Sequence, residues 1–205
     1  MSAGSRSRAG SGRGCGAVLV AASAGGVQSL GVLLGGLEGT LPVPVLVAQH
    51  LRRARETRIV TVLSRSTPLP VKLAQEGEDP QAGTVYIAPP DRHLCVNAGG
   101  VLGLSAAGPV NFARPAADPL FESAARAHGP RIIACVLTGA DSDGARGVRS
   151  VKAQGGIVIA QDPMSAVFQG MPKAAVETGN CDFVLPLGDI APVIGRVLRR
   201  GWPES

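Results

Sequence analysis

The chain has 205 residues, of which 45% are hydrophobic and only 3% aromatic, and its formal net charge is +5. This length and apolar content suit a globular domain with a core of its own and exclude a chain that is disordered throughout. The charge is weak evidence for nucleic acid, because three arginines and no acid lie in residues 1–16, and few aromatic side chains are available to stack on bases. The longest apolar runs are broken by Gly or Pro, so we expect no membrane insertion.

Strand-like and helix-like segments alternate along most of the chain. A Gly-, Ser- and Arg-rich stretch at 1–15 is expected to be a flexible tail, 16–200 to form one domain, and 201–205 to be a C-terminal tail. The expected strands are 17–22, 43–49, 71–75, 84–88, 131–137, 157–161 and 182–185, with a hairpin at 93–96 and 101–104. The expected helices are 25–34, 56–64, 118–128, 143–154, 172–178 and 189–200.

The alternation defines the expected fold class. Apolar strands that alternate with helices predict an α/β three-layer sandwich, with a mostly parallel, doubly wound sheet and helices on both faces. The third helix is expected to start with Asp118 as its N-cap and Pro119 as its first residue. In such folds ligands bind at the carboxyl ends of the strands. Candidate functional residues are therefore those that directly follow strands.

Three of the expected strands are followed by residues whose side chains can act in catalysis. Ser23 follows the first strand, His50 follows the second, and Asp141 and Asp143 follow the strand at 131–137. A hydroxyl, an imidazole and a carboxylate at one sheet edge can serve as nucleophile, general base and orienting acid. The residues alone leave open which aspartate takes the third role.

Each of these residues also has a structural interpretation. Ser23 precedes a helix and is a good N-cap, and Asp143 could cap the helix that follows it. His50 could be a structural histidine at the end of a strand. The coincidence of all three at one edge favours the catalytic interpretation.

Backbone groups near these side chains could hold a negative charge. Ala24, Gly25 and Gly26 lie at the start of a helix, and Ala140 lies beside the two aspartates. Backbone N–H groups at a helix start can point at an anion, which is what an oxyanion hole requires. These four residues are the candidate oxyanion donors.

Arg52, Arg53 and Arg55 follow His50 closely. They are either a solvated helix face or a docking surface for an acidic partner. Gln49 and Gln169 are polar residues near the expected site to which the sequence assigns no role.

No cofactor or metal is expected. The cysteines at positions 15, 95, 135 and 181 form no Cys-x-x-Cys pair. The Gly-rich stretch at 12–16 precedes the first strand instead of following it, which is the wrong place for a dinucleotide-binding loop. A short apolar run at 16–22 after an Arg-bearing start is similar to a signal peptide but is better explained as the first strand, so we expect a cytoplasmic location.

At this point the sequence resembles the catalytic domain of the CheB family of chemotaxis protein-glutamate methylesterases. Six segments carry the resemblance in the family's order: Ala-Ser-Ala-Gly-Gly at 22–26, Ala-Gln-His-Leu at 48–51, Tyr-Ile-Ala-Pro-Pro-Asp-Arg-His at 86–93, Arg-Pro-Ala-Ala-Asp-Pro-Leu-Phe at 114–121, Leu-Thr-Gly-Ala-Asp-Ser-Asp-Gly-Ala at 137–145, and 160–175, which begins Ala-Gln-Asp-Pro. Together they span nearly all of 17–198.

The resemblance implies a sheet of about seven parallel strands and a Ser–His–Asp catalytic triad. It maps the nucleophile to Ser23, the base to His50 and the carboxylate to Asp143 instead of Asp141. It also implies hydrolysis of glutamyl methyl esters through an acyl-enzyme, and in some members deamidation of glutamines. The implied partners are methylated cytoplasmic helices of chemoreceptors and, for regulation, a separate response regulator or chemosensory kinase.

The sequence departs from the family pattern in two respects. Ala24 stands where the family usually has Thr, Ala140 and Asp141 where it has Met and Gly, and Arg52 where it has Pro. Many family members carry an N-terminal receiver domain, whereas few residues precede the first strand here, so we expect no control by phosphorylation in cis. The alternatives to the methylesterase are a triad hydrolase of another ester and a chemosensory binding module with a decayed site.

Overall fold

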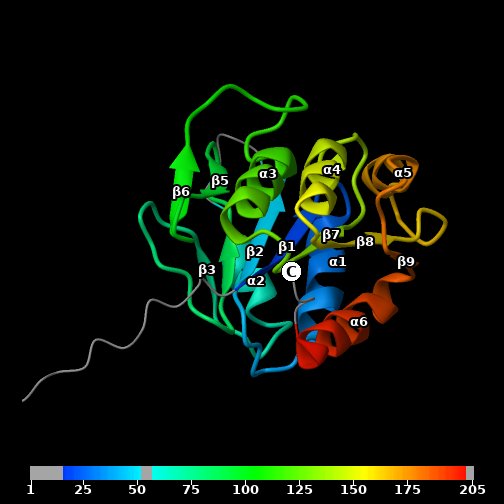
Figure 1. The fold of residues 1–205 in the computed structure, drawn as a ribbon, viewed down its shortest axis with the longest axis horizontal. Helices are drawn as coiled ribbons and strands as arrows, with labels where there is room; N and C mark the ends of the chain where they lie inside the picture. Colours follow the sequence, from blue (N-terminus) through cyan, green and yellow to red (C-terminus); the bar gives the residue numbers. More distant parts are fainter. Residues whose placement is uncertain (1–15, 52–56, 202–205) are drawn as a thin grey trace, which may run out of the picture.

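The computed structural model describes residues 16–51 and 57–201. Seven parallel strands form one sheet in the order β3-β4-β2-β1-β7-β8-β9 (Figure 1). They are β1 (Ala17–Ala22), β2 (Val45–Gln49), β3 (Val71–Leu73), β4 (Val85–Ile87), β7 (Ile132–Val136), β8 (Ile157–Gln161) and β9 (Phe183–Leu185). The two expected tails, at 1–15 and in most of 201–205, lie outside the described residues.

The helices cover both faces of this sheet. On one face lie α1 (Gly26–Gly35), α2 (Ile59–Leu63) and α6 (Leu187–Arg200). On the other lie α3 (Ala117–His128), α4 (Ala145–Ala153) and α5 (Gly170–Glu177). The chain runs from β1 to one edge of the sheet and then returns to β7 on the other side of β1. This is the doubly wound α/β sandwich that the alternation of segments predicts.

β1 shows why these residues form a central strand. All six of its side chains are buried, and successive residues point to opposite faces. Ala17, Leu19 and Ala21 pack in the core beneath α3, α4 and α5, whereas Val18 and Val20 pack in the core beneath α1, α2 and α6. Continuous apolar sequence is what a parallel strand covered on both faces requires.

The expected hairpin is also present. β5 (His93–Val96) and β6 (Leu102–Ser105) pair antiparallel as a separate small sheet. Ser123 of α3 accepts the N–H of Val96 through its hydroxyl at 3.0 Å, which attaches the hairpin to α3.

The expected N-cap of α3 is wrong. Ala116 occupies that position, and Asp118 lies inside the first turn. The Asp118 carboxylate instead accepts the backbone N–H of Gly147 in α4 at 2.8 Å. The first turn of α3 is capped from a distance by Asp143, so a local capping rule had no means of finding its partner.

None of the helices in the described ranges combines the length and the apolar character that crossing a bilayer requires.

Candidate active site

The three residues expected to act together follow three neighbouring strands. β2, β1 and β7 are adjacent in the sheet, and Ser23, His50 and Asp143 lie beyond their carboxyl ends. The backbone hydrogen bonds of the sheet continue beyond the strand ends. The His50 N–H donates to Ala22 O at 3.1 Å, and the Ser23 N–H donates to Thr138 O at 3.0 Å. β1 and β7 also bound the point where the strand order reverses, which is where open α/β sheets place their ligands.

His50 and Asp143 form a direct pair. His50 Nε2 lies 2.8 Å from Asp143 Oδ2, and the Asp143 side chain is wholly buried. Asp143 therefore holds one nitrogen of the imidazole and leaves Nδ1 as the nitrogen available to Ser23. In the expected triad the two ring nitrogens would therefore exchange the roles that they have in the chymotrypsin template.

Asp143 is held by more than His50. It accepts backbone N–H groups of Ala117 at 2.5 Å, Asp118 at 3.2 Å and Gly144 at 3.0 Å. The side-chain amide of Asn111 donates to it at 3.1 Å. A buried carboxylate with this many donors is fixed in position and remains charged.

The pKa of Asp143 reflects this environment. Burial alone would raise it, but the hydrogen bonds from His50 and Ala117 and the charge of His50 lower the pKa below its usual value. The neighbouring Asp118 behaves in the opposite way, because its burial raises its pKa and the charge of Asp143 adds to that effect. The pKa values of these two neighbouring carboxyl groups are therefore shifted in opposite directions, and that of Asp143 is the lower.

Asp141, the other candidate acid, contacts the opposite side of the imidazole. Its Oδ2 lies 3.3 Å from His50 Nδ1, and its Oδ1 accepts the backbone N–H of Asp143 at 2.9 Å. Both aspartates left open by the residues alone therefore contact His50, and among the described residues no hydrogen bond joins His50 to Ser23 Oγ.

Ser23 does not cap the helix that follows it. The N-cap of α1 is Gly25, with a φ of 74° that favours glycine. Ser23 uses its carbonyl to accept the N–H of Gly26 at 2.8 Å, while its hydroxyl is left without a protein partner among the described residues. The turn therefore presents the Ser23 side chain beyond the sheet edge instead of using it in the helix.

Gln49 joins Ser23 and His50. Its side-chain amide donates to the carbonyl of Ser23 at 2.9 Å and to that of His50 at 3.1 Å. A Cβ at Gly26 would lie 2.2 Å from Gln49 Oε1, so glycine is required there for the side chain to fit. Gln169, the other unassigned glutamine, lies exposed immediately before α5.

The four candidate oxyanion donors differ in what their N–H groups do. Gly26 donates to Ser23 O within the turn. In the described ranges the N–H groups of Ala24, Gly25 and Ala140 have no acceptor. Their role as oxyanion donors stays a prediction, with these three as the free candidates.

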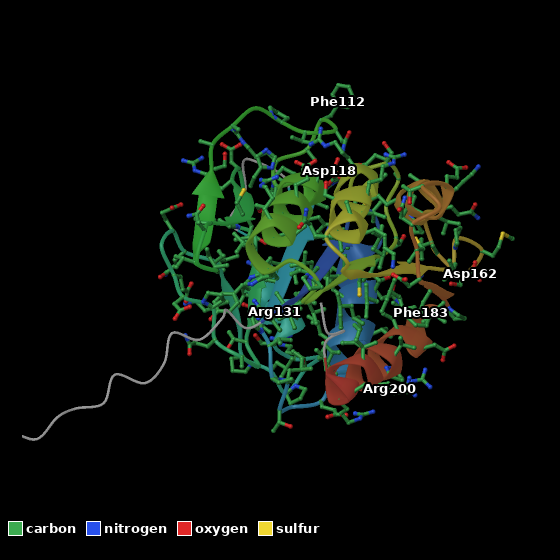
Figure 2. All side chains as sticks on the ribbon, in the orientation of Figure 1. Phe112, Asp118, Arg131, Asp162, Phe183 and Arg200 are labelled. Carbon is green, nitrogen blue, oxygen red and sulfur yellow. The ribbon has the colours of Figure 1, made fainter. Side chains whose placement is uncertain are left out.

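Exposed apolar side chains lie on two loops that are attached to the site. Phe112 is fully exposed, and Met164, Val167 and Phe168 are 84%, 69% and 44% exposed. Phe112 follows Asn111, which donates a hydrogen bond to Asp143, in the loop that rises above α3 (Figure 2). The 162–169 loop is attached to the site because Thr138 Oγ1 accepts the N–H of Phe168 at 2.9 Å.

Other predicted features lie outside this site. Arg52, Arg53 and Arg55 fall outside the described residues. His93 is buried and structural, since its ring contacts Gly108 O and the N–H of Ala116.

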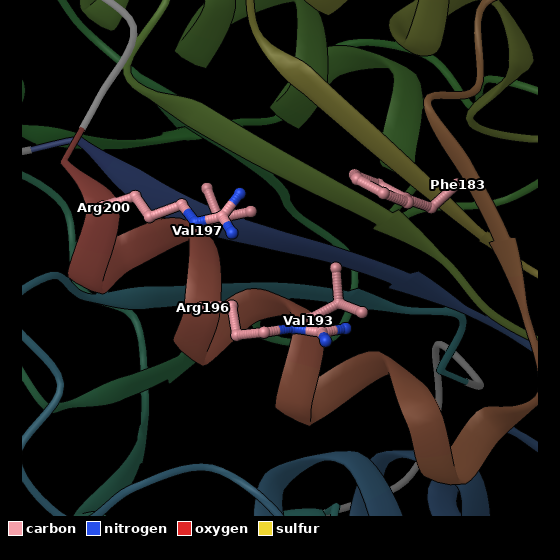
Figure 3. A pocket seen from close by; sticks show the side chains of 5 residues that line it. All are labelled: Phe183, Val193, Arg196, Val197 and Arg200. Carbon is pink, nitrogen blue, oxygen red and sulfur yellow. The ribbon is translucent and has the colours of Figure 1, made fainter.

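A separate hollow lies between β9 and α6 (Figure 3). It has a volume of about 280 Å³ and is lined by Phe183, Val193, Arg196, Val197 and Arg200. None of the site residues lines it.

Asn111 is a residue that sequence reasoning missed. It lies in an irregular segment and joins Asp118 and Asp143 through one amide, at 3.1 Å from each. No periodicity or motif marks such a residue; only its position next to the expected third helix could have drawn attention to it.

The fold and the gathering of Ser23, His50 and Asp143 at one sheet edge are those expected of a hydrolase, and comparison with known proteins gives the family. A family model described as "CheB methylesterase" matches residues 18–194. The chain belongs to this family, as the sequence resemblance indicated. The structure matches the crystal structure of the CheB methylesterase catalytic domain of Thermotoga maritima with a TM-score of 0.85 and 36% sequence identity. The match covers 89% of this chain and 98% of that one.

Curated relatives agree. The chain is 42% identical over 89% of its length to protein-glutamate methylesterase/protein-glutamine glutaminase 1 of Paramagnetospirillum magneticum, covering 49% of that protein. It is 34% identical over 88% of its length to a putative protein-glutamate methylesterase/protein-glutamine glutaminase of Leptospira interrogans, covering 94% of that protein. The chain spans about half the length of several curated relatives that it matches.

Proposed function

We propose that this chain hydrolyses glutamyl methyl esters on chemoreceptors and, by the same chemistry, deamidates glutamines. The observation that carries the proposal is the pair between His50 and a wholly buried Asp143 at the sheet edge where Ser23 emerges. Membership of the methylesterase family gives the reaction class, and the names of its relatives cover both activities.

In the proposed mechanism, Ser23 attacks the ester carbonyl while His50 removes its proton. Asp143 holds the N–H at Nε2, so the lone pair at Nδ1 accepts the proton from Ser23 Oγ. The negative charge on the carbonyl oxygen would be stabilised by the free N–H groups of Ala24, Gly25 and Ala140, each worth a factor of about 10²–10³ in rate.

The second half returns the enzyme to its starting state. His50 gives its proton to the leaving methoxide, which departs as methanol and leaves Ser23 acylated. Water then attacks the acyl-enzyme while His50 takes its proton, and His50 returns that proton to Ser23 Oγ as the glutamyl acid leaves. A glutamine side chain would follow the same steps with ammonia as the leaving group. No cofactor takes part in these steps.

The surroundings of the site support a protein substrate. Phe112, on the loop that carries Asn111, and Met164, Val167 and Phe168, on the 162–169 loop, are exposed apolar side chains. We propose that they contact a large partner. Arg52, Arg53 and Arg55 are proposed to meet acidic residues of the receptor helices. Because this substrate is the cytoplasmic part of the receptor, we propose that the protein works in the cytoplasm, where a separate response regulator or kinase could regulate it.

The proposal is tested by methanol release from a methylated receptor cytoplasmic fragment, with Ser23→Ala as the matched control. We expect release from the native chain and none above background from the variant. A panel of small esters and labelling of Ser23 by a fluorophosphonate complete the test. Labelling and small-ester turnover without methanol release would indicate a hydrolase of another ester, and failure of all three would indicate a binding module.

A further inference from the structure

Both nitrogens of the proposed base face a carboxylate. Nε2 of His50 lies 2.8 Å from Asp143 Oδ2, and Nδ1 lies 3.3 Å from Asp141 Oδ2. Nδ1 is also the nitrogen that has to accept the proton of Ser23. The position next to the reactive nitrogen is therefore occupied by an acid instead of the serine hydroxyl.

Neutral histidine cannot satisfy both contacts. It carries one N–H and one lone pair, and a lone pair that faces a carboxylate oxygen is repelled. Only the imidazolium, with a proton on each nitrogen, can donate to Asp141 and Asp143 together. Burial by itself would lower the pKa of His50, but the hydrogen bonds and charges of the two aspartates outweigh it and raise the pKa to about 9.

The side chains of Asp141 and Asp143 differ in how freely they can move. Asp143 is wholly buried, whereas the Asp141 side chain is 36% exposed and can turn into water. Asp141 is held in its present position by one bond, from the Asp143 backbone N–H to its Oδ1 at 2.9 Å. Among the described residues these two aspartates are the charged groups that face His50; Asp118 of α3 acts on Asp143 instead.

We propose that Asp141 is a positioning residue that holds the base protonated: its carboxylate binds Nδ1–H of His50 and has to withdraw before Ser23 can lose its proton. This inference rests on the proposed function, because it takes His50 as the base for Ser23. In the resting enzyme the site is closed by this contact. Activity then requires a pH, or a bound substrate, that separates Asp141 from the ring.

The variant that tests this is Asp141→Asn. Its amide oxygen can still accept the Asp143 N–H, so the turn is kept, while its NH₂ group can donate to the lone pair of a neutral His50. Asp141→Ser removes the charge and the reach to the ring but keeps an oxygen for the turn. Asp189→Asn is the charge-matched control, because Asp189 lies in the first turn of α6 and has no contact with His50.

Three measurements as a function of pH give the readout. They are the titration of the His50 ring by NMR, the rate at which a fluorophosphonate labels Ser23, and kcat/KM for methanol release. In both Asp141 variants we expect the pH midpoint of each of these three measurements to fall by about 1–3 units, because removal of a nearby negative charge lowers the pKa of a histidine. At neutral pH the labelling rate would rise about tenfold for every pH unit by which the midpoint falls, until the midpoint reaches neutral pH and the rate levels off, whereas Asp189→Asn would leave it unchanged.

The outcomes separate this inference from the proposed function. Midpoints that stay within the range of the Asp189 control would overturn the role of Asp141, and so would a His50 titration that moves without any change in labelling. If the midpoints of the His50 titration and of Ser23 labelling both fall, but no form of the protein releases methanol, the role of Asp141 is supported and the proposed substrate is refuted.

Discussion

Asp143 joins the chemistry of the site to the stability of the fold, so its replacement tests both. Asp143→Ala removes the acceptor of three backbone N–H groups, those of Ala117, Asp118 and Gly144. Each buried N–H left unpaired costs about 1–3 kcal/mol. The variant also leaves His50 without its buried partner, and removal of one member of a buried pair typically costs about 3–5 kcal/mol in all.

We therefore expect Asp143→Ala to lower the free energy of unfolding by at least about 3 kcal/mol at neutral pH. The folded pKa of Asp143 is lower than its usual value of 3.8, so this stabilisation is present above that pH and is lost as pH falls through the folded pKa. The difference between the native chain and the variant should accordingly shrink in acid. Urea unfolding at several pH values measures it.

Asp182→Ala is the matched control, because Asp182 also accepts a backbone N–H, that of Val158, and pairs with a cation, Lys152, but is 28% exposed. It should cost about 1 kcal/mol. Asp143→Asn, which keeps the shape, should lower kcat by about 10⁴ while more of the protein stays folded. If Asp143→Ala is no more destabilising than Asp182→Ala, the account of Asp143 as the distant cap of α3 is refuted.

Two further predictions concern the same sheet edge. The pKa of His50 is raised to about 9 in the folded protein from 6.5, so its stabilisation is complete below pH 6.5 and is lost as pH rises through about 9. Unfolding free energy should fall across this window, and a His50→Gln variant that shows the same fall would argue against the assignment. Gly139→Ala would place a Cβ 2.0 Å from Met171 Sδ and 3.0 Å from Ser23 Cβ, so it should reduce both stability and Ser23 labelling. In a Met171→Ala background Gly139→Ala should cost less stability than in the native chain, and an equal cost in both backgrounds would indicate that the strain lies elsewhere.

Much of the fold was predictable from local pattern. Continuous apolar runs bounded by Gly and Pro marked the strands of the parallel sheet, because such strands are covered on both faces. Position at the end of a strand was enough to select Ser23, His50 and the two aspartates, because parallel strands bring their carboxyl ends to one edge. The resemblance to the family then chose Asp143.

The cap of α3 was not predictable. Asp118 satisfies every local rule for an N-cap, yet the structure uses Asp143, which is 26 residues from Ala117 along the chain. Asn111 escaped for the same reason, since its two acceptors come from α3 and from the loop after β7. Sequence rules describe neighbours within a few residues and carry no information about contacts of this kind.

The sequence by itself determined the strands, the two-sided core and the set of candidate site residues, because the pattern of apolar residues within each short segment indicates them. Tertiary structure alone decided how those side chains are used. His50 and Asp143 are 93 residues apart and meet at 2.8 Å only because β2, β1 and β7 lie side by side. The contact of Asp141 with Nδ1 is likewise a product of packing, and we propose that it helps to keep His50 protonated.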